Sequence, residues 1–405
     1  MTRADRPAED GARLGELDVL RGFALFGILL VNAQLMAGPR TVIDGGPDAS
    51  ALDRGLAWTV TALVATKFYL LFSFLFGYGF VLQERSARRS GAAFAPRHLR
   101  RAAGLFALGA VHAVVLYPGD ILMTYAVLSL LLYGLRGLGP VGALRLAAAL
   151  VAALAALLLA YGLLTVALTE PYTPDPHDPA SADTVAAYRG DPLSVLAAHL
   201  RDLPAAIGAN LLYSADMLAA FLAGLAAART RLVERRGRDR AWLRGAVVRW
   251  LPVGLAGGVV TACCANGPLD SRWFHVGYAV AVLTAPALTA AYACGLLLLL
   301  DALGPAAARP LAAAGRLALT HYLTQSLVLA CVLTGYGPGL YDRVGTVALL
   351  AGCVVLYGTQ LALSAGLAGR VRYGPAEWLL RTVTGAGRPP ACPGPRPADA
   401  ARPAP

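Results

Sequence analysis

Long apolar runs are the feature that most constrains this chain. Stretches of roughly twenty apolar residues recur between short polar breaks, and a helix of about that length is needed to cross roughly 30 Å of hydrocarbon. With 57% apolar residues, 15% charged residues and a mean hydropathy of +0.58, the chain lies outside the range of water-soluble domains. The sequence therefore predicts an all-α, polytopic transmembrane helix bundle.

We predict about ten transmembrane spans, and an even number places both termini on the same side of the bilayer. A cleavable signal peptide is not expected, because mostly polar residues precede the first run and that run is too long. The predicted spans are 17–38, 56–83, 99–117, 119–135, 141–168, 203–228, 245–265, 276–301, 315–335 and 345–367.

The loops between these spans differ in charge, and this difference predicts their sides. Arginines crowd loops 84–101 and 229–244, whereas segment 169–202 carries six acidic residues against two arginines. Basic residues accumulate in cytoplasmic loops, so the first two loops are expected inside and 169–202 outside. Both termini are then cytoplasmic.

The same reading divides the chain into three parts. Residues 1–16 form a cytoplasmic N-terminal arm and residues 17–385 form the transmembrane domain. The stretch 386–405 is rich in proline and glycine and lacks an apolar period, so we expect a disordered cytoplasmic tail.

Several classes of function are not expected. The net charge of +11 comes without basic runs interleaved with aromatics, so no nucleic-acid partner is predicted. The six cysteines show no metal-binding spacing, and we expect neither a metal site nor a bound cofactor. No serine-nucleophile motif or phosphate-binding loop is present in the sequence. The lipid bilayer is the expected partner, and the sequence leaves the oligomeric state open.

Ionisable residues at membrane depth carry the most information, because an unpaired charge in hydrocarbon is costly. Lys67, the single lysine beside 34 arginines, lies near the middle of the second span. It serves either as a functional ammonium or as a structural counter-ion. His112 in the third span either moves a proton or bonds a neighbouring helix. Asp120 follows a Pro-Gly turn, where it caps a helix, orients His112, or does both.

Other polar residues are expected to face the same interior. Asp18 and Arg21 lie three apart on one helix face and can pair at the cytoplasmic edge of the first span; the alternative for Arg21 is simple snorkelling to the interface. Tyr125 is expected to line a cavity with His112. Asp216 lies near the middle of the sixth span, where it would be protonated without a partner.

The ninth span contributes three further candidates. The spacing of His321 and Gln325 puts them on one helix face, and Tyr322 lies next to them. We expect these three side chains to line the interior and bind substrate. Four glycines within the predicted spans are expected to be points of close packing between helices: Gly77, Gly79, Gly224 and Gly315.

Five segments carry a resemblance to a known family: LDVLRGFALFGILLVN at 17–32, KFYLLFSFLFGYGF at 67–80, HAVVLYPGDILMTYA at 112–126, GRLALTHYLTQS at 315–326 and RYGPAEWLLR at 372–381. Together they resemble the YeiB-like membrane proteins, domain-of-unknown-function family 418, over about residues 14 to 385. The resemblance implies a bacterial-type plasma (inner) membrane location. One position departs from it, because His321 is usually asparagine in that family.

The resemblance also implies a chemistry. The family looks like a distant relative of multi-span acyltransferases, in which a buried histidine takes part in transfer from an acyl-coenzyme A donor. His112 and Lys67 would fill the catalytic and charge-stabilising roles, with Asp120 orienting the histidine. The leading hypothesis is a transmembrane acyltransferase that acts on a small-molecule or envelope acceptor.

Two other functions remain open at this point. A proton-coupled transporter or exporter of a small metabolite would use Lys67, His112 and Asp216 as a pathway, although the sequence shows no obvious inverted repeat. A non-catalytic membrane assembly factor would use the same polar residues only to hold helices together.

Overall fold

The computed structural model describes residues 6–43, 45–46, 48–171, 179–367, 370 and 373–384. Within these ranges the chain forms helices and turns without any strand, which confirms the predicted all-α class. The predicted tail 386–405 lies outside the described residues. The first helix begins at Arg6, so helix continues into the predicted N-terminal arm.

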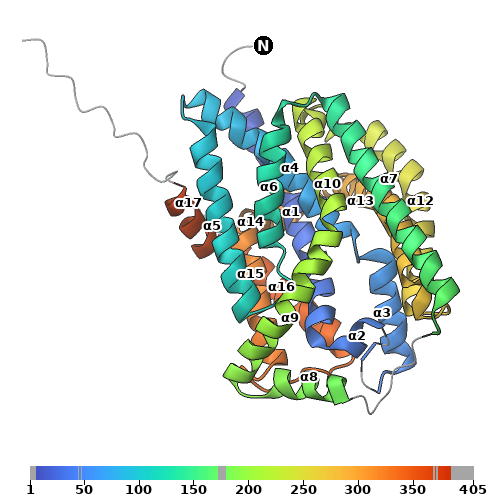
Figure 1. Cartoon of the computed structure of the whole chain (residues 1–405). Helices are drawn as coiled ribbons and strands as arrows, with labels where there is room; N and C mark the ends of the chain where they lie inside the picture. The colour runs from blue at the N-terminus through green and yellow to red at the C-terminus, as the bar shows by residue number, and fades with distance from the viewer. Residues whose placement is uncertain are drawn as a thin grey trace, which may run out of the picture.

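The helices stand side by side as a bundle (Figure 1). The first half contains α1 (Arg6–Ala37), α2 (Pro39–Ile43), α3 (Ala51–Leu63), α4 (Lys67–Arg89), α5 (Phe94–Val115), α6 (Leu122–Gly134), η1 (Leu135–Gly137), α7 (Pro140–Leu168) and α8 (Pro179–Arg189). The second half contains α9 (Pro192–Leu212), α10 (Ser214–Arg229), α11 (Leu232–Arg236), α12 (Arg240–Asn266), η2 (Ser271–Trp273), α13 (Phe274–Leu303), α14 (Pro305–Arg316), α15 (Ala318–Leu333), α16 (Thr346–Leu367) and α17 (Pro375–Val383).

Six segments of the described chain are long and apolar enough to cross a membrane, and two bent pairs raise the number to as many as eight. The bent pairs are α9 with α10, at 48°, and α14 with α15, at 76°. The predicted count of ten spans is reached only if α5 and α6 also cross the membrane. The first of these begins with several basic residues, and the second has 13 residues. That count stays a prediction, whereas a multi-span membrane bundle follows directly from these helices.

The two ends of the bundle differ. At one end, here called the basic end, α4 connects to α5 and α10 connects to α12 through arginine-rich segments. At the other end, here called the opposite end, α8 lies across the bundle (Figure 1). The ring of Tyr188 stacks on that of Tyr341 at 4.5 Å, and Arg189 donates to the carbonyl oxygens of Tyr341 at 2.7 Å and Asp342 at 2.9 Å. The predicted outer segment 169–202 therefore contains an anchored helix in its described part.

Glycines bring helices into contact where the sequence predicted close packing. A Cβ atom on Gly77 would lie 2.0 Å from the carbonyl oxygen of Phe221, and one on Gly224 would lie 2.0 Å from that of Phe74. These two glycines therefore allow α4 and α10 to cross backbone to backbone. Gly315 allows the same approach of α14 to α1, because its Cβ would lie 1.8 Å from the carbonyl oxygen of Asp18.

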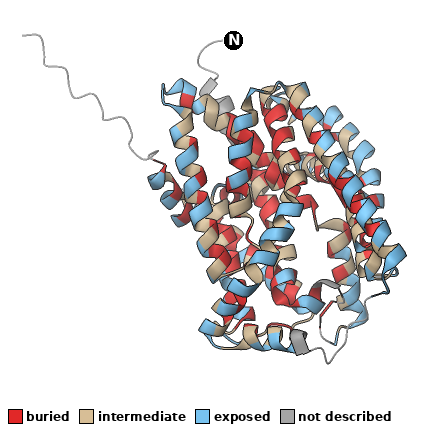
Figure 2. Ribbon diagram, in the orientation of Figure 1, coloured by how far each residue is buried: buried red, intermediate tan, exposed pale blue. Residues whose placement is uncertain are grey.

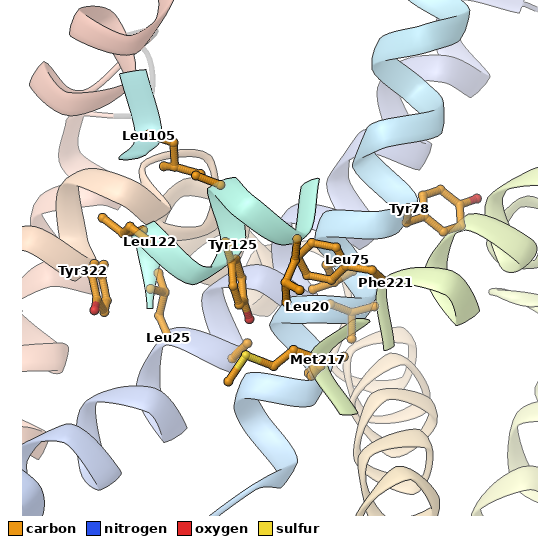
Figure 3. Packing of buried hydrophobic residues seen from close by; sticks show 14 of the residues in the cluster. Leu20, Leu25, Leu75, Tyr78, Leu105, Leu122, Tyr125, Met217, Phe221 and Tyr322 are labelled. Atoms are coloured by element: carbon orange, nitrogen blue, oxygen red, sulfur yellow. The ribbon is translucent and has the colours of Figure 1, made fainter. Parts of the chain in front are cut away.

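Buried residues follow the inner faces of the helices and exposed apolar residues follow the outer faces (Figure 2). This is the burial pattern expected of a bundle whose outer surface meets lipid. The main core gathers aliphatic and aromatic side chains from α1, α4, α5, α6, α10 and α15 (Figure 3). Tyr125 and Tyr322 belong to this core, and both also reach a cavity.

Candidate functional site

His112 and Asp120 form a buried pair at the turn between α5 and α6. Nδ1 of His112 lies 2.9 Å from Oδ1 of Asp120, and each side chain is 1% exposed. The other carboxylate oxygen of Asp120 accepts a hydrogen bond from the backbone N–H of Met123 at 2.9 Å, in the first turn of α6. Asp120 thus satisfies a free amide of the helix and contacts the histidine at the same time. The pair predicted from spacing is present.

Polar atoms at this pair are left free for a ligand. The His112 ring is turned so that its close contact with Asp120 does not meet hydrogen-bond geometry, and Nε2 of His112 has no partner among the described residues. The hydroxyl of Tyr322 has no side-chain partner among them either, although the backbone N–H of Ile121 faces its oxygen, and the Tyr322 ring lies 5.1 Å from the His112 ring. Buried polar groups are normally hydrogen-bonded, and these atoms are able to bond to water or to a ligand.

Gly109 makes room for the pair and was not singled out from the sequence. It lies three residues before His112, on the same face of α5. A Cβ atom there would lie 2.7 Å from Oδ2 of Asp120 and 2.7 Å from the backbone nitrogen of Met123. Only glycine lets the start of α6 approach α5 this closely.

A cavity of about 1020 Å³ opens at the basic end and reaches Tyr322. We call it the basic cavity. Arg21, held by Asp18 at 2.8 Å, lines it, and so does Tyr125, so the predicted Asp18–Arg21 pair is present. Eight arginines line it in all, beside two glutamates: Arg21, Arg85, Arg89, Arg101, Arg231, Arg235, Arg316 and Arg381. Such a wall favours an anionic ligand.

A second cavity of about 1070 Å³ lies towards the opposite end, and we call it the tyrosine cavity. Its wall contains seven tyrosines and the carboxylates Asp202 and Asp270: the tyrosines are Tyr69, Tyr117, Tyr188, Tyr213, Tyr278, Tyr322 and Tyr341. Ile28, Ile121 and Tyr322 line both cavities. The two cavities therefore meet at Tyr322, whose ring lies 5.1 Å from that of His112. His112 and Asp120 themselves line neither cavity, so the structure does not place Tyr125 and His112 in one cavity wall as predicted.

Lys67 has different partners from His112. Its ammonium donates to the carbonyl oxygen of Thr61 at 3.2 Å, in the last turn of α3. The predicted second span is broken here: α3 ends at Leu63, Thr66 has a φ of 72°, and Lys67 is the first residue of α4. A cation at the end of α3 complements that helix dipole. The structure does not bring Lys67 into contact with His112.

Asp216 is held by tyrosines of the tyrosine cavity. Its Oδ2 accepts a hydrogen bond of 2.5 Å from the hydroxyl of Tyr69, which lies 3.1 Å from the hydroxyl of Tyr278. Asp216 is 3% exposed, and its Oδ1 has no partner in the described part of the chain.

His321 and Gln325 face α16 instead of the cavities. Nε2 of His321 lies 2.7 Å from the hydroxyl oxygen of Ser364, and the amide of Gln325 donates to Gln360 at 2.8 Å. Their neighbour Tyr322 points the other way, towards His112. Of the three predicted residues on this helix, the structure brings only Tyr322 to the site.

Glu377 of α17 is a further residue that the sequence reasoning missed. Its carboxylate accepts hydrogen bonds from the backbone N–H groups of Leu319 at 2.8 Å and Thr320 at 3.0 Å, at the start of α15. It also lines the basic cavity. The α17 helix lies beside α5 at one edge of the bundle (Figure 1). The segment RYGPAEWLLR, which carried part of the family resemblance, was the available signal.

We expect Glu377→Ala to destabilise the protein by about 2 kcal/mol, because charge-assisted hydrogen bonds to a helix N-terminus are lost. Thermal unfolding of the purified protein in detergent measures this change. Glu377→Gln should lose less, since an amide oxygen can still accept. Glu84→Ala removes only a helix-surface pair with Arg88 and is the matched control. Equal midpoints for Glu377→Ala and Glu84→Ala would show that Glu377 does not anchor α17.

Comparison with known proteins gives a family and full-length relatives. The family described as "Protein of unknown function (DUF418)" matches residues 227–387. YxaH of Bacillus subtilis (strain 168) is 27% identical over 411 residues, covering 94% of this chain and 96% of the relative. A 39.9 kDa protein in the amylase 3' region of Bacillus acidopullulyticus is 30% identical over 393 residues, covering 92% and 94%. YeiB of Escherichia coli (strain K12) is 27% identical over 392 residues, covering 91% and 95%.

Proposed function

Because this chain belongs to the YeiB-like DUF418 family of multi-span membrane proteins, we propose for it a function that uses the whole depth of the bundle: transfer of an acyl group across the membrane. The donor is a coenzyme A thioester in the basic cavity, and the acceptor is a small molecule or envelope component in the tyrosine cavity. One observation carries the proposal. The two cavities meet at Tyr322, beside the buried His112–Asp120 pair.

The basic cavity suits the donor because coenzyme A carries several phosphate charges at one end. Arginine binds phosphate oxygens through its planar fork of donors and stays charged in every environment. The eight arginines would hold the phosphates near the mouth of the cavity. The basic end is then the cytoplasmic end, in agreement with the rule that basic loops stay inside, and the membrane is the bacterial plasma membrane.

His112 is the proposed general base. Oδ1 of Asp120 lies 2.9 Å from Nδ1, and a small turn of the His112 ring would let Nδ1–H donate to it, which leaves the lone pair of Nε2 for the acceptor. Nε2 takes a proton from an acceptor hydroxyl or amine, and that oxygen or nitrogen attacks the thioester carbonyl carbon. The C–S bond then breaks, the thiolate takes the proton from His112, and free coenzyme A leaves.

Tyr322 would stabilise negative charge on the substrate in this scheme. Its unpartnered hydroxyl beside His112 can donate to the carbonyl oxygen as negative charge develops there. The sequence assigned charge stabilisation to Lys67. Since the Lys67 ammonium meets Thr61, we assign that residue to the break between α3 and α4 instead.

The test uses the purified full-length protein, a panel of acyl-coenzyme A thioesters from acetyl to palmitoyl, and a small-molecule extract of bacterial envelopes as acceptor. We expect release of coenzyme A thiol, together with transfer of radiolabelled acyl group, for at least one donor. Thiol release that never exceeds a protein-free control, for any donor, would rule the activity out.

A transporter is a second candidate, and broken helices favour it. Helices interrupted near the middle of the bundle often form substrate sites in transporters, and here α3 breaks before α4, α9 bends into α10, and α14 bends into α15. Two cavities on opposite sides of Tyr322 also fit alternating access. Proton-driven flux of an unmodified metabolite into vesicles, without acyl transfer, would favour this candidate.

A further inference from the structure

We propose that the tyrosine cavity binds an organic cation, a protonated amine or quaternary ammonium group carried by the acceptor. That the cation belongs to an acyl acceptor rests on the proposed function, but cation binding itself can be measured without any reaction. Three features of the tyrosine cavity favour a cation: the charge of its wall, the buried carboxylate of Asp216 behind the wall, and the aromatic rings that the wall presents.

The wall has no cationic side chain of lysine or arginine among its described residues, in contrast to the eight arginines of the basic cavity. Two of its residues are carboxylates with partners outside the wall. Asp270 bonds the guanidinium of Arg272 at 2.8 Å, and these hydrogen bonds hold the pKa of Asp270 below its usual range. Asp202 bonds Arg201 at 2.8 Å and also accepts a hydrogen bond from Tyr188 of the wall at 2.9 Å. Apart from the imidazoles of His199 and His275, the wall therefore offers negative or neutral groups to a ligand.

Asp216 adds a carboxylate without a basic partner in the described chain. It lies directly behind Tyr69 of the wall, bonded to the Tyr69 hydroxyl at 2.5 Å. Because the Tyr69 hydroxyl donates to Asp216, the Tyr278 hydroxyl donates to Tyr69 across the 3.1 Å contact, and the lone pairs of the Tyr278 oxygen remain for the cavity. A buried ionised carboxylate is costly unless a positive charge is near, and a cationic ligand would supply that charge.

The neighbouring rings form the surface that would meet the cation. Tyr213 lies 4.5 Å from Tyr278, centroid to centroid, with 40° between the ring planes, and Phe274 lies 6.3 Å from Tyr278 on another side. All three line the cavity. Ring faces are negative and attract alkylammonium groups, most strongly when water is excluded. Ring faces and tyrosine oxygens together favour a cation, whereas beside a neutral sugar the buried Asp216 carboxyl would bind a proton instead.

The experiment titrates the purified full-length protein in detergent by calorimetry with choline and with 3,3-dimethylbutan-1-ol, which has the same shape without the charge. We expect choline to bind at least tenfold more tightly than the neutral alcohol. Asp216→Asn and Tyr278→Leu should each weaken choline binding about tenfold, and Tyr278→Phe, which keeps the ring, should weaken it about threefold or less. Asp301→Asn, at an exposed pair with Arg240, is the matched control and should bind choline as the parent does.

The outcomes separate the two proposals. If the protein binds choline but transfers no acyl group, the proposed cation site stands and the proposed acyltransferase activity is wrong. Equal affinities for choline and the neutral alcohol, or tight binding of maltose that Asp216→Asn leaves unchanged, would overturn the cation site. The comparison of the two ligands on the parent protein decides the question even if a variant fails to fold.

Discussion

Replacing His112 with alanine is expected to lower the rate of acyl transfer by about 10²- to 10⁴-fold, because the group that moves the proton is lost. Asp120→Asn should lower the rate less, because Nε2 of His112 can still take a proton although the carboxylate that orients the ring is lost. Initial rates of coenzyme A thiol release at saturating donor measure both effects.

The chain supplies a matched control in its own sequence. His321 is another buried histidine, but its ring contacts the hydroxyl of Ser364 in α16, whereas the His112 ring lies beside Tyr322, which lines both cavities. His321→Asn should therefore keep the rate within a few-fold of the parent. A fully active His112→Ala protein, or a His321→Asn protein as impaired as it, would remove His112 from the proposed chemistry.

Gly224→Ala should destabilise the folded protein by about 2 to 3 kcal/mol, because the added methyl group meets backbone and not a side chain that can turn away. The nearest atom would be the carbonyl oxygen of Phe74 at 2.0 Å, so α10 and α4 must separate. Thermal unfolding in detergent, followed by size-exclusion chromatography, measures the loss of folded protein.

Gly358→Ala is the control for this substitution. Gly358 lies inside α16, and a Cβ atom there would meet nothing within 4 Å. Alanine is a better helix former than glycine, so this variant should be unchanged or slightly more stable. If Gly224→Ala matched Gly358→Ala in stability, the close crossing of α4 and α10 would be wrong.

Features set by local chain geometry could be predicted from the sequence. The apolar runs predicted the helical bundle. Gly77, Gly224 and Gly315 were predicted as close-packing points, although the helices that they meet were not, and Gly79 instead faces Arg21 at the basic cavity. His112 and Asp120 are eight residues apart with a Pro-Gly turn between them, so their meeting needs only a helix end and a turn. The Asp18–Arg21 pair likewise follows from helix spacing alone.

Features that depend on how distant helices converge could not be predicted. The break before Lys67 has no glycine or proline in the letters ALVATKF, so the sequence predicts one continuous span over 56–83. On a continuous helix the Lys67 ammonium would be available to a partner on another helix. Arginines such as Arg101 and Arg235 were explained by sidedness alone, and only the folded bundle shows that they share one cavity.

The side chains of α15 illustrate the same limit. Spacing correctly placed His321 and Gln325 on one face, but it could not say which neighbour that face meets. The structure turns them to Ser364 and Gln360 of α16, and turns Tyr322 to His112. The residues around α15 in the sequence do not indicate either contact, because the partners lie on other helices that pack against α15 only in the folded protein.

The most direct test of the central claim is the density of a bound donor analogue in which a methylene group replaces the thioester sulfur of acetyl-coenzyme A. An electron cryo-microscopy structure of the full-length protein with this compound should place its phosphates among the arginines of the basic cavity. Its carbonyl should lie within hydrogen-bonding reach of Tyr322 and beside Nε2 of His112. An analogue bound elsewhere, or one whose carbonyl is separated from His112 by packed side chains, would contradict the account.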